Sequence, residues 1–353
     1  MEMMRAIVVD APGKVRVAED VPKPVCGDYE ALVRVEYCGF CNGSDFHIIN
    51  ATMLKEEGLQ DFPTVLGHEG CGEVVEVGKK VRYIKPGDRF IHNNLRPDVG
   101  NGYTKTYGGM AEYGLVADHK AMLEDGYEQK DLPFYKKFQQ VPRDFDFVDG
   151  AMLLSLSESL SAARNFGVGP GKDVIIFGAG PMGTAVATYS KILGAESVYI
   201  VDCQQDRLEN AIRVAGVDRA INFAKEDVAE ALGGKLFDIG IDAVGKSSVL
   251  LQISGMLKPL GVAGSMGVLK KDDLLLDLSK LKNSTKLQML NFPLGEYDVM
   301  EENIRLIGQG AINPKDFYSH IEPMDEIEKI MELVSSKKAL KVIIKIRKDA
   351  ENA

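Results

Sequence analysis

Residue types that bind catalytic metal ions gather in two short segments of the N-terminal third of the chain. The first segment holds Cys41, Asp45 and His47, and the second contains the pair His68-Glu69. Thiolate, imidazole and carboxylate are ligands of a catalytic zinc ion, which keeps three protein ligands and one open position. Because each residue type taken singly is more often structural, the zinc interpretation needs support from the rest of the chain.

A glycine-rich motif supplies that support near the middle of the chain. Val174-Ile175-Ile176-Phe177 runs directly into Gly178-Ala179-Gly180-Pro181-Met182-Gly183, a G-x-G-x-x-G pattern between a predicted strand and a predicted helix. The first glycine allows a tight turn, the second admits a pyrophosphate, and the third lets the helix pack on the sheet. The phosphates would then bind at the helix N-terminus, where free N–H groups favour anions.

Two side chains, Asp202 and Arg207, bear on the choice of dinucleotide, and they lie at the end of the next predicted strand and shortly after it. Asp202 ends the strand Val198 to Val201, about 20 residues past the glycines, where a carboxylate bonds the adenosine ribose hydroxyls. A carboxylate there repels a 2′-phosphate, so we expect NAD rather than NADP. Arg207 either lies over the adenine or is a solvated helix residue.

The predicted elements indicate two kinds of domain. Short strands within the first 120 residues, among them 5–10, 31–37, 72–77, 89–92 and 111–116, indicate an antiparallel β-rich domain. From residue 150 onward strands alternate with helices, which predicts βαβ units and a parallel sheet. Residues 122–140 are polar and are interpreted as an irregular insertion, either bordering the substrate cleft or a subunit contact, or a plain surface loop.

Composition excludes several classes of protein. The 353 residues carry a formal net charge of −10, which argues against a nucleic-acid partner because phosphate contacts demand a basic face. No stretch approaches the ~20 apolar residues needed to span a bilayer, and the N-terminal apolar run is too short for a signal peptide. Five scattered cysteines fit a reducing compartment, so we expect a cytoplasmic protein without disulfides or membrane contact.

Taken jointly, five motifs resemble the zinc-dependent medium-chain dehydrogenases, the family of alcohol, sorbitol and threonine dehydrogenases. The resemblance covers nearly the whole chain. The motifs are the Cys41 to His47 segment, Gly67-His68-Glu69 with Gly72, Lys85-Pro86-Gly87-Asp88-Arg89, Gly108-Gly109-Met110-Ala111-Glu112-Tyr113 and the glycine fingerprint. The family implies an α/β protein in which a discontinuous GroES-like β-rich catalytic domain (1–150 and 293–353) accompanies a doubly wound, parallel-sheet Rossmann domain that binds NAD (151–292).

The resemblance implies one catalytic zinc. Cys41 and His68 become ligands, Glu69 a ligand or a neighbour that exchanges with water, and Asp45 the residue that fixes the tautomer of His68. The family places two residues between the cysteine and the aspartate, whereas this chain has three, and Gly43 permits the required bulge.

The third ligand and the structural zinc of the family are where this chain departs most. Sorbitol-type members supply the third ligand from a Glu-Pro-Leu segment, but the aligned Leu154-Ser155-Leu156 lacks a carboxylate. Glu158 lies on the same helical face as Leu154, so we predict it as the substitute ligand, the alternative being a surface glutamate. Residues 91–107 lack the four cysteines of a structural zinc, so no second zinc is expected, and Cys38, Cys71 and Cys203 are interpreted as packed small residues.

The resemblance also implies a proton relay and a set of cofactor contacts. Ser44 takes the alcohol proton and passes it, through the nicotinamide ribose, to His47, unless His47 is a surface residue outside the relay. By alignment, the residues expected against the cofactor besides the fingerprint are Val244, Gly245, Met266, Gly267, Val268, Leu290, Asn291 and Phe292.

The leading functional hypothesis is a zinc-assisted, NAD-dependent interconversion of a secondary alcohol, a polyol or sugar-like molecule, with its ketone. Phosphorylated sugars and amino alcohols remain open as substrates. The alternatives are a zinc-free medium-chain quinone or enone reductase and a non-catalytic nicotinamide-binding module. We expect a homodimer or homotetramer, in which the strand 261–266 could pair across a two-fold axis.

Overall fold

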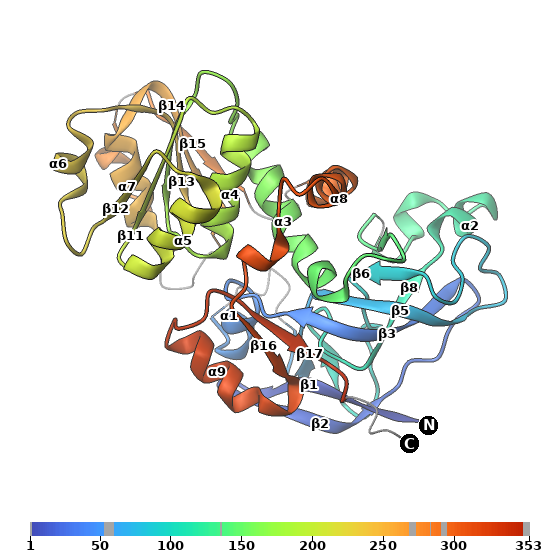
Figure 1. Ribbon diagram of the computed structural model, residues 1–353. Coiled ribbons are helices and arrows are strands. Elements are labelled where there is room, and N and C mark those ends of the chain that lie inside the picture. The colour runs from blue at the N-terminus through green and yellow to red at the C-terminus, as the bar shows by residue number, and fades with distance from the viewer. Residues whose placement is uncertain are drawn as a thin grey trace. The chain divides into compact units, whose positions relative to one another are not determined.

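The computed structural model describes residues 2–52, 60–134, 136–267, 273–282, 284–290 and 295–348. The chain divides into two compact units (Figure 1), of which the first comprises Met1–Leu154 with Tyr318–Ala353 and the second Ser155–Phe317. The domain boundaries expected after residues 150 and 292 stay a prediction. Within the described residues no helix is long and apolar enough to cross a membrane.

Two sheets form the first unit. One sheet has the order β2-β1-β4-β7, with β2 (Lys14–Pro22), β1 (Met3–Ala11), β4 (Thr64–Val65) and β7 (Thr104–Lys105). The other has the order β16-β17-β3-β5-β6-β9, with β16 (His320–Pro323), β17 (Val342–Lys345), β3 (Glu30–Gly39), β5 (Glu69–Val77), β6 (Arg89–Ile91) and β9 (Gln139–Val141), while β8 (Tyr113–Ala117) also pairs with β3.

The predicted antiparallel, β-rich character of this unit is confirmed. β3 pairs antiparallel with β5, β8 and β17. The buried face of these strands is apolar: Ala31, Val33 and Val74 pack with Val116 in one core cluster. The C-terminal strand β17 therefore returns to the middle of a sheet that the N-terminal residues begin, which makes the unit discontinuous in sequence.

Residues 122–140 are less irregular than expected. The helix α2 (His119–Glu124) opens the segment, with Asp118 accepting a hydrogen bond from Ala121 as its N-cap, and Gln139–Val141 form β9 at its end. The expectation of a wholly irregular segment was wrong because β6 offers a free edge, to which β9 pairs antiparallel.

A parallel sheet forms the core of the second unit. Its order is β12-β11-β10-β13-β14-β15, with β12 (Arg219–Asn222), β11 (Ser197–Asp202), β10 (Asp173–Phe177), β13 (Phe237–Asp242), β14 (Leu257–Ser265) and β15 (Lys286–Met289), and every adjacent pair is parallel. This is the predicted doubly wound, Rossmann-type sheet, with the strand order reversing between β10 and β13.

Helices cover both faces of this sheet because each presents an apolar stripe to it. They are α4 (Pro181–Ile192), α5 (Gln205–Ala215), α6 (Val228–Leu232) and α7 (Ser247–Gly255). Side chains of α6 and α7, including Val228, Leu250 and Ile253, pack on Ile175 and Phe177 of β10. Val174 and Ile176 alternate with these residues along β10 and are also fully buried, so the opposite face is covered as well.

Three further helices lie outside the sheet core. α3 (Phe147–Asn165) runs through the boundary between the units, α8 (Met300–Gly308) belongs to the second and α9 (Ile327–Ser335) to the first.

The expected pairing edge is corrected. The strand 261–266 falls within β14, which pairs with β13 on one side and β15 on the other. Its edge is therefore occupied, and in the described part of the sheet β15 is the outer strand.

Candidate active site

Cys41, His68 and Glu69 come together in the first unit. One potential ligand atom from each lies within 4.8 Å of the others. The pairing of β3 with β5 explains the encounter, because Gly39 stands opposite Glu69 in the register. Cys41, two residues after the end of β3, therefore lies close to the residues at the start of β5. Cys41 is half-buried, whereas His68 and Glu69 are buried.

Asp45 lies beside this cluster as expected. It begins the short helix α1 (Asp45–Ile49), and its Oδ1 is 3.7 Å from Nδ1 of His68. Its Oδ2 accepts a hydrogen bond of 2.8 Å from the amide of Cys41. The extra residue in the loop is therefore accommodated with Asp45 still facing the imidazole.

The electrostatics of this pair follow from burial. Burial raises the pKa of Asp45 to about 6, although the charge of His68 acts in the opposite direction. Burial also disfavours the charged form of His68, yet the hydrogen bond with Cys41 and the charges of Asp45, Cys41 and Glu69 raise its pKa to about 10. The acidic groups of Cys41, Asp45 and Glu69 thus favour a cation at the position of His68.

Lys341 is a member of the site that the sequence did not reveal. Its Nζ lies 2.6 Å from Oε2 and 2.8 Å from Oε1 of Glu69, and both side chains are buried. Lys341 immediately precedes β17, whose Ile343 pairs with Gly39, so it arrives through the same sheet as Glu69. The two residues are 272 positions apart, and no local pattern marks either as the partner of the other.

Ser44 and His47 flank Cys41 and Asp45 on the same loop and helix. Ser44 is buried, and its amide donates to Sγ of Cys41 at 3.4 Å. Nδ1 of His47 lies 2.6 Å from Oγ1 of Thr52. Both residues therefore lie on the segment that carries Cys41 and Asp45. Their role in a proton relay stays a prediction.

Two segments that sequence reasoning did not single out surround His68. The ring of Tyr107 packs against the ring of His68, with centroids 4.9 Å apart. His92, which has a left-handed backbone (φ 59°), directs Nδ1 to the carbonyl oxygen of His68 at 2.9 Å. Burial and the nearby charge of His68 lower the pKa of His92 to about 3, so it is neutral and donates from Nδ1.

The glycine fingerprint of the second unit has the geometry that a dinucleotide needs. Gly178 follows β10 with φ 101°, a conformation that favours glycine. A Cβ on Gly183 would lie 1.9 Å from the carbonyl oxygen of Gly178, so only glycine lets α4 approach the loop this closely. Pro181 and Met182 form the first turn of α4, whose free amides face the loop.

Asp202 and Arg207 both lie at this loop. The carboxylate of Asp202, at the end of β11, accepts hydrogen bonds from the amides of Ala179 at 2.7 Å and Gln204 at 2.9 Å. An ideal Cβ on Gly180 would lie 3.8 Å from Nη1 of Arg207. Arg207 is therefore next to the glycine loop rather than on a remote face of α5.

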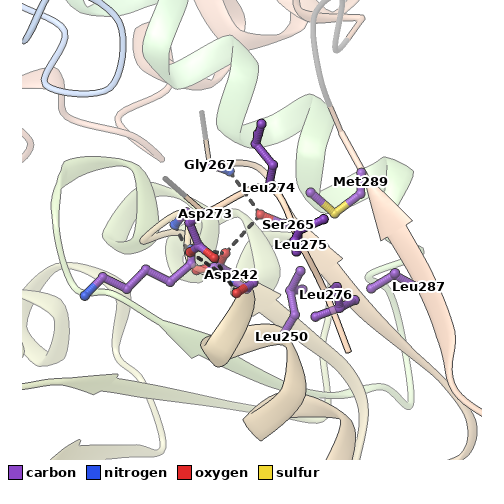
Figure 2. A pocket seen from close by; sticks show the side chains of 13 residues that line it. Asp242, Leu250, Ser265, Gly267, Asp273, Leu274, Leu275, Leu276, Leu287 and Met289 are labelled. Carbon is purple, nitrogen blue, oxygen red and sulfur yellow. Dashed lines mark hydrogen bonds between the residues drawn. The ribbon is translucent and has the colours of Figure 1, made fainter. Parts of the chain in front are cut away.

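A pocket lies at the carboxyl ends of β13 and β14 (Figure 2). The buried carboxylate of Asp242 accepts hydrogen bonds from the amides of Val244 and Gly245 and from the hydroxyl of Ser265. A Cβ on Gly267 would lie 2.2 Å from Cα of Gly245, so the two loops touch through glycines. Figure 2 shows these polar groups beside the side chains of Leu274, Leu275, Leu276, Leu287 and Met289.

The remaining predicted residues have different outcomes. Glu158 lies on α3 in the second unit and exposes only 6% of its surface, which argues against a surface glutamate, and its role as a ligand stays a prediction. Val268 and Asn291 lie outside the described residues. Cys38 and Cys71 are buried as expected, but Cys203 is exposed just after β11, so its interpretation as a packed residue was wrong.

Comparisons with known proteins agree with this arrangement. Residues 27–124 match the alcohol dehydrogenase GroES-like domain family, and residues 181–309 match the zinc-binding dehydrogenase family. Sorbitol dehydrogenase from Bombyx mori is 26% identical over 97% of this chain and 98% of its own length. Human sorbitol dehydrogenase is 27% identical over 98% of this chain and 97% of its own length.

A solved structure is similar throughout. A zinc-binding dehydrogenase-type protein from Sinorhizobium meliloti 1021, bound to NADP, superimposes with a TM-score of 0.76 at 25% identity, covering 98% of this chain and 99% of that one. The expected GroES-like and Rossmann folds are thereby confirmed. The chain belongs to the zinc-type medium-chain dehydrogenase/reductase family.

Proposed function

We propose that this protein is a zinc-dependent dehydrogenase that oxidises a secondary alcohol of the polyol class to a ketone with NAD, and runs the reaction in reverse. The observation that carries the proposal is the cluster of Cys41, His68 and Glu69 within 4.8 Å, in a chain that also carries a dinucleotide loop. The polyol class is supported by the two sorbitol dehydrogenases to which the chain is similar.

The residues of the first unit fit a zinc ion. A thiolate, an imidazole and a carboxylate are ligands that zinc accepts. In the described part of the chain, Nδ1 of His68 and Oδ1 of Asp45 are buried without a hydrogen-bond partner. A bound cation would favour the neutral form of His68. One ring nitrogen would then act as the ligand, and Nδ1–H would face Asp45.

We propose Cys41, His68 and Glu158 as the zinc ligands and Glu69 as the exchanging neighbour. Both oxygens of Glu69 lie within 2.8 Å of Lys341, so this carboxylate already has a buried counter-charge. Glu158 exposes only 6% of its surface and lies four residues after Leu154, where the aligned segment of sorbitol-type members supplies the third ligand.

In the proposed reaction the alcohol gives up a proton and a hydride, and NAD⁺ is reduced to NADH. When bound, zinc supplies Lewis acidity at the alcohol oxygen, and the nicotinamide accepts the hydride. Ser44 receives the hydroxyl proton, and His47 passes it to solvent. Asp45 orients His68, and Lys341 holds Glu69 as a buried ion pair. The ketone, NADH and one proton leave the site.

The preference for NAD is proposed from Asp202. Its carboxylate is anchored by two backbone amides at the position of the adenosine ribose, where it would repel a 2′-phosphate. Arg207, whose Nη1 would lie 3.8 Å from a Cβ on Gly180, is a cation at the loop that could counter this preference. The related structure bound to NADP makes the preference worth measuring directly.

The test is reduction of NAD⁺ and NADP⁺ with a panel of polyols, monitored by absorbance of the reduced nicotinamide. We expect activity with at least one polyol, a higher kcat/KM with NAD⁺, and loss of activity in Cys41→Ala. The matched control is Cys203→Ala, which removes an exposed thiol. Activity towards quinones or enones instead, unaffected by Cys41→Ala, would favour the zinc-free reductase. Cofactor binding without any turnover would favour the binding module.

A further inference from the structure

A cationic group lies next to the metal-ligand cluster and has no part in the mechanism above. Lys105, the last residue of β7, directs Nζ to Oδ1 of Asn94 at 2.6 Å and lies 4.0 Å from the centre of the Phe134 ring. Lys137 follows on the same insertion as Phe134, and its charge acts on Lys105. We name Asn94, Lys105 and Lys137 the basic cluster.

The backbone ties the basic cluster to His68. Lys105 pairs with Val65 in the register of β7 and β4, and His68 follows three residues after Val65. Tyr107, two residues beyond Lys105, packs on the ring of His68. Asn94 lies two residues beyond His92, which bonds to the carbonyl of His68. Both segments that surround His68 therefore carry a member of the basic cluster.

The positive charges of the two lysines in the basic cluster have no acidic partner among the described residues. Among the described residues no carboxylate lies within ion-pair distance of Lys105 or Lys137. Asn94 exposes 2% of its surface, and its Nδ2 has no hydrogen-bond partner in the described part of the structure. Burial, followed by the charge of Lys137, lowers the pKa of Lys105 to about 7. A half-buried amine, a second cation nearby and a buried amide donor without a partner are costly unless an anion completes them.

We propose that the basic cluster binds an anionic oxygen group of the substrate, so that the preferred substrate is a polyol carrying a phosphate or a carboxylate. This inference rests on the proposed function, because it identifies a substrate class for the same site. Lys105 and Lys137 supply charge, and Nδ2 of Asn94 donates a directional hydrogen bond. The chemistry shared by phosphate and carboxylate is a compact group with several acceptor oxygens.

A purely structural role for Lys105 makes a different prediction. If the contact with Phe134 serves only to hold the insertion, replacement of Lys105 lowers stability and affects all substrates alike. If the basic cluster binds an anion, replacement alters the ratio of activities towards charged and neutral substrates.

The experiment compares sorbitol, sorbitol 6-phosphate and gluconate as substrates of the metal-loaded protein, and measures binding of sorbitol 6-phosphate and inorganic phosphate by calorimetry in the absence of turnover. The variants are Lys105→Met, Lys137→Met and the charge-preserving Lys105→Arg. The control is Lys130→Met, which removes an exposed lysine of the same insertion. Loss of one charge-assisted hydrogen bond predicts a roughly 10- to 100-fold fall in kcat/KM for the anionic substrate relative to sorbitol in Lys105→Met.

The outcomes are separable. A higher kcat/KM for sorbitol 6-phosphate than for gluconate, or the reverse, identifies which anionic group the basic cluster prefers. Partial recovery in Lys105→Arg and an unchanged ratio in Lys130→Met support the basic cluster. Wild-type protein that oxidises sorbitol but neither binds nor prefers an anion overturns this inference and leaves the proposed function standing. Anion binding that depends on Lys105 without oxidation of any alcohol supports the basic cluster and overturns the proposed function.

Discussion

Replacing Lys341 by methionine isolates the buried ion pair with Glu69. Both oxygens of Glu69 lie within 2.8 Å of Nζ, and the side chains of Lys341 and Glu69 expose 5% and 0%. Removing one partner leaves a buried carboxylate without its counter-charge, which typically costs about 3–5 kcal/mol. We therefore expect Lys341→Met to lower the free energy of unfolding of the metal-free protein by an amount in that range, measured by urea denaturation.

The double variant Lys341→Met, Glu69→Gln is the control. With the carboxylate also neutralised, the uncompensated charge disappears, so the double variant should recover about half or more of the loss. Zinc should reduce the loss in the single variant, because a cation near Glu69 replaces part of the missing charge. A loss below about 1 kcal/mol in Lys341→Met, or a double variant as unstable as the sum of the singles, would refute the reasoning.

Three further predictions concern the second unit. Gly183→Ala should weaken NAD binding more than tenfold, because the new Cβ would lie 1.9 Å from the carbonyl oxygen of Gly178, and Gly255→Ala, which has open space, is the calorimetric control. Asp202→Gly should raise the ratio of kcat/KM for NADP⁺ over NAD⁺, and an unchanged ratio would assign the preference to another residue. Although burial disfavours its charge, hydrogen bonds from Lys258, Ser197 and Lys235 hold the pKa of Asp173 below its usual value. Asp173→Asn should therefore cost about 1–2 kcal/mol at pH 7. In urea denaturation at each pH, the difference from wild type should begin to shrink as the pH falls below about 4, the pKa of an unfolded aspartate, and should continue to shrink towards the lowered pKa of the folded state.

The parts of the site that local motifs encode could be predicted from the sequence. His68 and Glu69 are adjacent in the chain, and Gly178 to Gly183 need only a strand before them and a helix after them. The alternation of strands with helices also predicted the parallel sheet, because this pattern is compatible with few other folds.

The parts that depend on long-range pairing could not be predicted. Lys341 reaches Glu69 because β17 inserts beside β3, and Lys105 reaches the neighbourhood of His68 because the two-residue strand β7 pairs with β4. Strands this short carry no periodicity. The same reason explains why β14 was taken for an edge, since Lys286–Met289 gave no strand signal before the structure placed β15 beside it.

Metal content per chain tests the central claim most directly. Plasma emission spectroscopy on protein purified without chelators should find about one zinc ion per wild-type chain, close to none in Cys41→Ala, and a reduced amount in Glu158→Ala. Wild-type protein that contains no zinc after dialysis against zinc, yet still binds NAD, would contradict the account and leave Cys41, His68 and Glu69 as structural residues.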